Sequence, residues 1–240
     1  MRPRSARLRF LPLVPLIAII ALSRAPVSGQ AQVAESPAIH PVSGRHIAQV
    51  MSHLGADWLD RPERKAEEQP DKALDDIGVK PGDVVADVGA GTGYYTVKLA
   101  ARVRPGGRVY ATDIQPEMLD KLRARLAAEK VSGVEPVLAH ADNQGLPAGA
   151  LDLILLVDVY HELSEPQRTL QQLKSALKPT GRLVLLEFRK EDPAVPIRID
   201  HKMSVAEARL EVEHEGFVFD RVSEVLPWQH ILVFRPAARP

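Results

Sequence analysis

The stretch Val84–Leu99, VVADVGAGTGYYTVKL, joins a run of apolar residues to a helix-like segment through a glycine-rich turn. A turn in this position commonly presents its backbone to a ligand. The dinucleotide-binding pattern G-x-G-x-x-G would need a third glycine where this chain has Tyr94. A pyrophosphate must reach the helix N-terminus without obstruction by a side chain, so the turn favours a ligand without phosphate. Its spacing is D-x-G-x-G-x-G, formed by Asp87, Gly89, Gly91 and Gly93.

From residue 84 onward, apolar runs typical of buried strands alternate with segments of helical spacing. The run at residues 151–160 is apolar on both faces, as the centre of a parallel sheet requires. The last two runs, residues 216–226 and 228–236, have no helix between them, so they must form an antiparallel hairpin with a tight turn at Pro227. We therefore predict an α/β fold, a doubly wound, mostly parallel seven-stranded sheet with a C-terminal antiparallel β-hairpin. The other predicted strands are residues 84–89, 108–113, 134–140 and 182–188.

Two of the connecting helices carry start signals in the sequence. Ser164 and Gln167 match a capping box, which predicts a helix that ends at Pro179. Ser204 and Glu207 match a second capping box and predict another helix before the hairpin.

The first 31 residues have a basic start, an apolar run at residues 10–22 and small residues before Ala31. This layout is typical of a secretory signal peptide, which predicts an exported protein, periplasmic or secreted. An uncleaved anchor to the inner membrane through residues 10–22 is the alternative. Removal of residues 1–31 takes away five arginines and leaves 26 basic against 31 acidic groups, a net charge of −5. Such a body lacks the positive charge that nucleic-acid binding requires, and with no cysteine it has no disulfide or thiolate chemistry.

Three segments are predicted between the N-terminus and the sheet. Residues 32–45 are a linker, residues 46–78 form a helical lid, and residues 79–240 form the main domain. Within the lid, the apolar spacing predicts an amphipathic helix over residues 46–54 and a second helix over residues 70–78.

The chain resembles the class I S-adenosylmethionine-dependent methyltransferases over residues 74–235. Four sequence elements in order and the terminal hairpin carry this resemblance. The predicted signal peptide indicates an exported bacterial member. Each element resembles one part of that family's cofactor domain. The elements are VVADVGAGTGYY at residues 84–95, VYATDIQPEML at 109–119, AHADNQGLP at 139–147 and LDLILLVDVYHEL at 151–163.

The resemblance implies S-adenosyl-L-methionine as the cofactor. In this family an acid that closes the second strand holds the ribose hydroxyls, and Asp113 has that place. An acid after the third strand meets the adenine amino group, which assigns Asp142, with Asn143 beside it. Asp87 orients the glycine turn or meets the cofactor's ammonium group through water. For Asp87 the alternative is a purely structural role, and for Asp142 it is a solvated loop acid. The predicted cofactor site comprises Asp87, Gly89, Ala90, Gly91, Gly93, Tyr94, Asp113, Ile114, Asp142, Asn143 and Asp158.

The residues just past the fourth strand occupy the place where ligands sit in open α/β sheets. Methyl transfer depends mostly on positioning, and a general base is needed only where the nucleophile holds a proton of high pKa. His161 is the candidate base because an unperturbed imidazole has a pKa of about 6.5, and Tyr160 lies beside it as a second catalytic candidate. A structural histidine is the alternative. In the lid, Trp58, Arg61 and Arg64 would suit a planar or anionic acceptor, unless the segment is a charged linker.

No metal site is predicted, because the segment HELSE lacks the second histidine of a metalloprotease helix and the other histidines do not cluster along the chain. The predicted function is methyl transfer to a small-molecule or envelope acceptor. No nucleic-acid partner is expected, and membrane contact is expected only if residues 1–31 are retained. The alternative is an exported module that binds adenosylmethionine or a nucleoside without transfer. Tyr94 and the hairpin argue against a nicotinamide oxidoreductase, and the sequence leaves the oligomeric state open.

Overall fold

The computed structural model describes residues 38–238. The predicted signal peptide or anchor, residues 1–31, and the first part of the predicted linker lie outside the described residues and stay predictions. Within the described range, none of the helices has both the length and the apolar character needed to cross a membrane.

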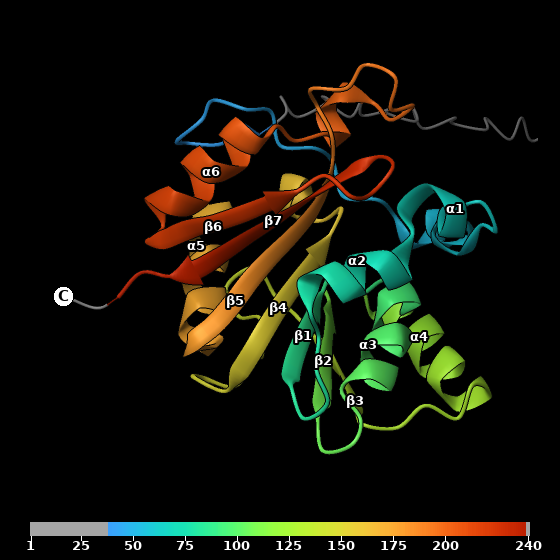
Figure 1. The fold of residues 1–240 in the computed structure, drawn as a ribbon. Helices are drawn as coiled ribbons and strands as arrows, with labels where there is room; N and C mark the ends of the chain where they lie inside the picture. Colours follow the sequence, from blue (N-terminus) through green and yellow to red (C-terminus); the bar gives the residue numbers. More distant parts are fainter. Residues whose placement is uncertain (1–37, 239–240) are drawn as a thin grey trace, which may run out of the picture. The chain divides into compact units, whose positions relative to one another are not determined.

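A seven-stranded sheet organises the described chain (Figure 1). The strand order is β3-β2-β1-β4-β5-β7-β6; the first five strands run parallel, and β7 is antiparallel to both of its neighbours. The predicted fold class is therefore confirmed. The strands are β1 (Val84–Val88), β2 (Arg108–Asp113), β3 (Val134–Leu138), β4 (Leu151–Val157), β5 (Leu177–Phe188), β6 (Phe217–Ser223) and β7 (Gln229–Pro236).

Helices cover both faces of this sheet (Figure 1). On β4, Leu153 and Leu155 belong to the apolar cluster under α2 and α3, whereas Ile154 and Leu156 belong to the cluster under α5 and α6. Alternate side chains of one strand thus pack on opposite faces, which is why this strand is apolar throughout. The helices are α1 (Arg64–Glu68), α2 (Pro70–Ile77), α3 (Tyr94–Arg102), α4 (Pro116–Ala128), α5 (Pro166–Ala176) and α6 (Val205–His214), with short 3-10 helices η1 (His53–Asp60), η2 (Tyr160–Glu162) and η3 (Ile199–His201).

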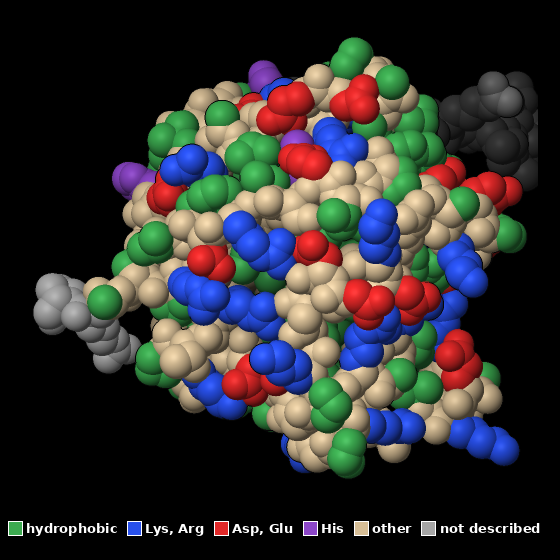
Figure 2. Space-filling model, viewed as in Figure 1, with side chains coloured by type: hydrophobic (Ala, Val, Ile, Leu, Met, Phe, Trp, Pro, Cys, Tyr) green, Lys and Arg blue, Asp and Glu red, His purple; other side chains and the backbone are tan. Residues whose placement is uncertain are grey.

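The molecular surface mixes charges of both signs. On the face shown in Figure 2, Lys and Arg side chains lie among Asp and Glu side chains. Ion pairs join α2 to its neighbours, such as Arg102 with Asp75 at 3.1 Å and Arg221 with Asp76 at 2.8 Å. Exposed pairs of this kind contribute at most about 1 kcal/mol each, so they shape the surface field more than they stabilise the fold.

Residues 38–45 fold back onto the main domain, which corrects the described part of the predicted linker. Arg45 is buried and pairs with Glu211 of α6 through two hydrogen bonds, Nε to Oε1 at 3.0 Å and Nη2 to Oε2 at 3.1 Å. Ser43 Oγ donates to the same carboxylate at 2.5 Å. Arg45 also donates to the carbonyl oxygen of His161 at 3.1 Å. One guanidinium therefore connects the N-terminal segment, α6 and the loop after β4.

No helix forms over residues 46–54 before the start of η1, so the predicted amphipathic helix is wrong. Ile47 is 8% exposed, whereas Val50 is 39% and Leu54 is 85% exposed, so these apolar side chains share no buried face. Outside a helix, the N–H of Ala48 instead donates to the carbonyl oxygen of His161 after β4 at 3.0 Å.

The start and end of α5 differ from the prediction. Its N-cap is Glu165 and makes no side-chain bond, so the predicted capping box of Ser164 and Gln167 does not form. The helix ends at Ala176 rather than near Pro179, because the next residue already pairs with β4 at the start of β5.

The second capping box and the C-terminal hairpin are confirmed. Ser204 Oγ accepts from the N–H of Glu207, and the Glu207 carboxylate accepts from the N–H of Ser204. The two hairpin strands are joined by residues 224–228, a longer loop than the predicted tight turn. Arg189 holds this loop by donating to the carbonyl oxygen of Pro227 at 2.9 Å.

The Arg45–Glu211 pair predicts a large loss of stability in Glu211→Ala. The variant leaves a buried guanidinium without its partner, which costs about 3–5 kcal/mol of the free energy of unfolding. Urea denaturation measures this cost. Asp120→Ala is the control, because it removes an exposed pair with Arg123 on α4 and should cost at most about 1 kcal/mol. Equal losses in the two variants would contradict the structural role of the buried pair.

Candidate cofactor and acceptor site

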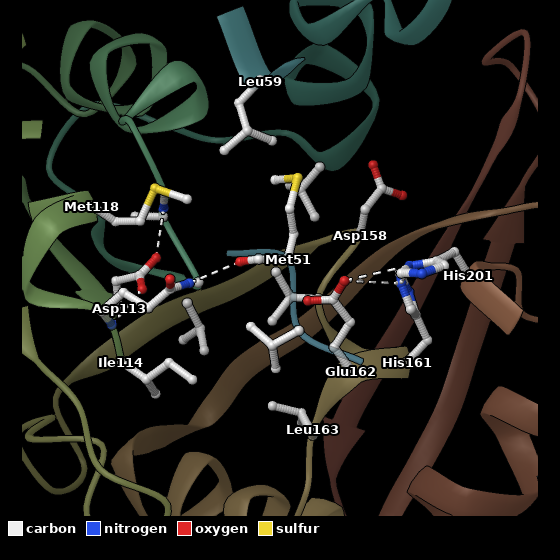
Figure 3. Close-up of a pocket in the computed structure, with 18 of the residues that line it drawn as sticks. Met51, Leu59, Asp113, Ile114, Met118, Asp158, His161, Glu162, Leu163 and His201 are labelled. Carbon is white, nitrogen blue, oxygen red and sulfur yellow. Dashed lines mark hydrogen bonds and ion pairs between the residues drawn. The ribbon is translucent and has the colours of Figure 1, made fainter. Parts of the chain in front are cut away.

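A cavity of about 880 Å³ opens at the carboxyl ends of the parallel strands. This volume lies within the range of about 300–1,000 Å³ that small-molecule sites occupy. Figure 3 shows Asp113 and Ile114 at one end, His161, Glu162 and His201 at the other, and Met51 and Leu59 between them. The cavity therefore lies where open α/β sheets bind ligands, with residues of the N-terminal segment in its wall.

The glycine turn after β1 lines the cavity through Gly89, Ala90 and Gly91. Gly89 and Gly91 have φ angles of 72° and 55°, which side chains rarely adopt. A Cβ on Gly89 would lie 2.5 Å from Val159, and one on Gly91 would lie 2.8 Å from Leu59. Bare backbone therefore faces the cavity at both positions.

Gly93, the third glycine of the turn, does not line the cavity. Its φ angle is 88°, and a Cβ there would collide with Cδ1 of Leu122 on α4. Gly93 therefore allows α3 and α4 to pack closely, a structural role distinct from the predicted cofactor contact. The next residue, Tyr94, does line the cavity.

Asp113 closes β2 and fastens the glycine turn. Its Oδ2 accepts from the N–H of Gly91 at 2.9 Å, and its Oδ1 accepts from the N–H of Gln115 at 2.8 Å. Burial raises the pKa of this carboxyl group, although the backbone donors oppose the rise. Each oxygen keeps a lone pair for a further donor, and both Asp113 and the half-exposed Ile114 line the cavity.

Asp142 and Asn143 do not line this cavity. They border a separate hollow beside α5, and Asp142 is exposed. The same loop instead presents Ala139, His140, Ala141 and Gln144 to the cavity. Gln144 is buried, and the sequence did not point to it because nothing in the loop distinguishes an inward side chain from an outward one.

Two further carboxyl groups lie beneath the turn and beside β4. Asp87 accepts from Thr96 Oγ1 at 2.5 Å, and burial raises its pKa to about 6. Asp158 has a φ of 53° and accepts from Gln229 Nε2 at 2.7 Å, while its Oδ1 has no hydrogen-bond partner among the described residues. Burial, together with the nearby carboxylates of Glu68 and Glu187, raises the pKa of Asp158 well above its usual value.

The lid residues reach the cavity, but their charges are already paired. The Arg61 guanidinium stacks over Trp58 at 3.7 Å from the ring centroid and binds the Glu67 carboxylate. Arg64 is buried, and its Nε donates to Glu68 Oε1 at 2.8 Å. All three predicted acceptor residues, Trp58, Arg61 and Arg64, are thus in the wall, but neither arginine is free to bind an anion in the way predicted.

Arg64 also fixes the lid to the main domain. Its Cζ lies 4.3 Å from the ring centroid of Tyr94 at the start of α3, and its Nη1 donates to the carbonyl of Leu59 at 2.8 Å. The described lid therefore divides in two: residues 49–68 contribute to the cavity wall, whereas α2 packs into the core through Leu74 and Ile77.

The two predicted catalytic residues point in different directions, one into the apolar core and one into the cavity. Tyr160 is fully buried in the apolar cluster under α5 and α6 and does not line the cavity, so it cannot reach a substrate there. His161 does line the cavity. Its Nδ1 lies 2.6 Å from Glu187 Oε2, and its Nε2 lies 3.2 Å from Nδ1 of His201. Burial lowers the pKa of His161, but the carboxylates of Glu187 and Glu162 together outweigh this effect and the net pKa is raised.

Comparison with known proteins identifies the family to which the chain belongs. A model described as a methyltransferase domain matches residues 86–185. The crystal structure of a SAM-dependent methyltransferase from Aquifex aeolicus shares 30% identity, covers 77% of this chain and 98% of its own, and superposes with a TM-score of 0.73. The chain belongs to the S-adenosylmethionine-dependent methyltransferases.

Other similar proteins share a shorter stretch of sequence with this chain or a lower identity. A ubiquinone/menaquinone biosynthesis C-methyltransferase from Hydrogenovibrio crunogenus is 34% identical over 119 residues, which is 49% of this chain and 47% of that protein. The chain thus spans about half the length of the curated relatives it matches. The [4+2]-cyclase SpnF has the same fold, with a TM-score of 0.61, 16% identity, and coverage of 83% of this chain and 90% of its own. The fold alone therefore does not fix the reaction.

The described residues fit S-adenosylmethionine, the cofactor of the family to which the chain belongs. The cofactor carries two positive groups, a sulfonium and an α-ammonium. The cavity offers two buried carboxyl oxygens that have no hydrogen-bond partner among the described residues, Asp158 Oδ1 and Glu68 Oε2. Asp113 would hold the ribose hydroxyls, and the bare backbone of Gly89 and Gly91 gives the methionine portion a close approach.

The structure predicts different effects for two acids that the sequence placed in one site. Asp113→Ala should raise the dissociation constant of adenosylhomocysteine at least about tenfold, because a charge-assisted hydrogen bond contributes roughly 1.5–3 kcal/mol and 1.4 kcal/mol is a factor of about ten. Asp142→Ala is the control and should leave the affinity unchanged, because Asp142 lies outside the cavity. Calorimetry on folded variants measures both. Weaker binding in Asp142→Ala alone would restore the sequence-based assignment.

The raised pKa of Asp87 predicts a stability difference that depends on pH. Below pH 3.8 the carboxyl group is largely neutral in both the unfolded chain and the folded protein, so burial costs little. As the pH rises from about 3.8 to about 6, the unfolded chain ionises while the buried group keeps its proton, so the folded protein loses stability relative to Asp87→Asn. The difference should grow by up to about 1.4 kcal/mol per pH unit and level off above that pH.

Urea denaturation without cofactor, between pH 4 and 7.5, measures this difference. Asparagine can still accept from Thr96, so the hydroxyl keeps its partner in the variant. A difference between the two proteins that does not change with pH would show that Asp87 ionises normally in the fold.

Proposed function

We propose that this protein transfers the methyl group of S-adenosylmethionine to a small, largely apolar acceptor that carries a ring hydroxyl group. The observation that supports this proposal is the single cavity that contains both the cofactor residues and a polar cluster. At one end lie the glycine turn and Asp113, and at the other lie His161, Glu162 and His201 (Figure 3). An acceptor in the second part of this cavity would lie next to the cofactor's methyl group.

The side chains that line the cavity support an acceptor that is largely apolar and carries a polar oxygen. Met51, Leu59, Val159 and Leu163 line the cavity and offer apolar contacts to a ring or an alkyl chain. The polar groups gather at the His161 end, where an acceptor oxygen would find hydrogen-bond partners. Small-molecule sites commonly combine an apolar wall with a few well-placed polar groups.

The chain's residues would act mainly by positioning. S-Adenosylmethionine, when bound, supplies a methyl group on a sulfonium leaving group, and the sulfur keeps the electron pair of the broken bond. Glu187 holds Nδ1 of His161 at 2.6 Å, so the ring is fixed and its Nε2 points to the cluster. The fixed cluster can orient the acceptor hydroxyl and assist loss of its proton.

The relatives suggest which acceptor to try first. Several are named C-methyltransferases of ubiquinone and menaquinone biosynthesis, and this chain shares about half of their length. We infer that a hydroquinone with an unsubstituted ring carbon is the best first acceptor, and that the methyl group goes to the ring carbon or to the hydroxyl oxygen.

The proposal predicts methyl transfer from tritium-labelled S-adenosylmethionine to a short-chain hydroquinone. His161→Gln should lower turnover by roughly 10²–10⁴-fold, because it removes one member of the cluster that positions the acceptor oxygen and assists its proton loss, while the affinity for adenosylhomocysteine stays the same. His214→Gln is the matched control, because this histidine is exposed at the end of α6. Product analysis and calorimetry are run on all three proteins. Tight cofactor binding without transfer to any of the hydroquinones and phenols tested would favour the binding module instead.

A further inference from the structure

Three side chains that can ligate a metal meet at the acceptor end of the cavity. His161 and Glu162 follow β4, and His201 comes from η3, forty positions later in the chain. Nε2 of His161 lies 3.2 Å from Nδ1 of His201 and 3.8 Å from Oε1 of Glu162. Nδ1 of His201 lies 3.4 Å from the same Oε1. Figure 3 shows the three side chains converging, and each of them lines the cavity.

This triangle of atoms has the size of a metal site. Two ligands about 2.0–2.1 Å from a tetrahedral zinc ion lie about 3.3–3.4 Å apart. The distances that involve His201 agree with this value, and a small rotation of Glu162 would bring its oxygen closer to His161. Two imidazoles and one carboxylate, with a fourth position open, are also the ligand set of a common class of catalytic zinc sites.

A fourth residue supports the cluster from behind. Glu187 Oε2 lies 2.6 Å from Nδ1 of His161, and its other oxygen accepts from the N–H of Tyr160 at 2.9 Å. A histidine that binds a metal through one nitrogen commonly donates its other N–H to a carboxylate, which fixes the tautomer and aims the free nitrogen. His161 therefore has the supporting contact that a metal ligand needs.

The charge of this pocket also fits a cation. Glu187 is fully buried and Glu162 is only 14% exposed at its side chain, and both carboxylates lie against His161. Buried carboxylates are costly unless a positive charge is close. A divalent ion bound at Nε2 of His161 would neutralise both at a short distance.

We propose that His161, Glu162 and His201 bind one divalent transition-metal ion of the zinc type, whose open coordination position faces the cavity and takes an oxygen of the acceptor. The second half of this inference rests on the proposed function. An acceptor hydroxyl bound there releases its proton to solvent and stays on the metal as an oxyanion. Transfer of the methyl group to that oxygen needs no further proton loss, whereas transfer to a conjugated ring carbon also releases the proton of that carbon.

The first experiment measures zinc alone, without cofactor or acceptor. Full-length protein without an affinity tag is treated with a chelator, dialysed, and titrated with zinc chloride by calorimetry, and bound zinc is measured after gel filtration. We expect one zinc ion per chain. His201→Ala and Glu162→Gln should each weaken binding at least about tenfold, and Glu187→Gln by roughly 10–100-fold. Each variant loses only one ligand, and the His201 side chain is partly exposed, so we expect both variants to fold. Two variants are used so that the result does not depend on one of them.

The control is His214→Ala, which should bind zinc as the natural chain does, because this histidine lies on the surface away from the cavity. Absence of zinc binding in the natural chain would overturn the proposal. Equal binding in His201→Ala and the natural chain would also overturn it, because the metal would then be elsewhere.

The second experiment tests the open position with cobalt, whose visible absorption reports its ligands. The protein loaded with one cobalt ion should change its spectrum when a hydroquinone is added. An unchanged spectrum would overturn the proposal that the acceptor oxygen binds the metal. The metal site itself would still be supported if zinc binding in the first experiment depends on His201. Failure of methyl transfer with a spectrum that does respond would refute the proposed function alone, so the two failures are distinguishable.

Discussion

The parallel pairing of β1 with both β2 and β4 is the constraint on which the rest of this structure depends. Val88 of β1 lies level with Thr112 of β2 and Leu156 of β4, so the residues that follow the three strands emerge at one edge of the sheet. The chain then turns to helices on opposite faces, which leaves a crevice between them. The glycine turn, Asp113 and Asp158 meet there because of this register, although they are far apart in the sequence.

Buried carboxylates set the electrostatic character of that crevice. Arg64 pairs with Glu68 at 2.8 Å, but Oε2 of Glu68 and Oδ1 of Asp158 have no partner among the described residues. Burial raises the pKa of Asp158 well above its usual value, so the fold holds this group at a cost in stability. A positive ligand would stabilise the ionised form of these unpaired carboxyl groups, and both the cofactor and a metal ion carry positive charge.

The N-terminal segment forms the outer wall of the cavity because it is held at separate points. Near the cofactor end, Gln115 donates to the carbonyl of Met51 at 2.9 Å and accepts from the N–H of His53 at 2.8 Å. Near the acceptor end, Arg45 binds Glu211 and the backbone of the His161 loop. The same segment thus touches both ends of the cavity, so its position can influence both ligands.

Local patterns in the sequence were sufficient for the sheet, the glycine turn and the place of Asp113 at the end of β2, because apolar alternation and glycine spacing are encoded by neighbouring residues. The side of the chain on which a loop residue points was not encoded locally. Asp142 faces outward and Tyr160 faces the core, while Gln144 and His161 face the cavity. Only tertiary structure could bring His201 to 3.2 Å from His161, because that contact depends on how a loop forty residues later folds over the end of β4.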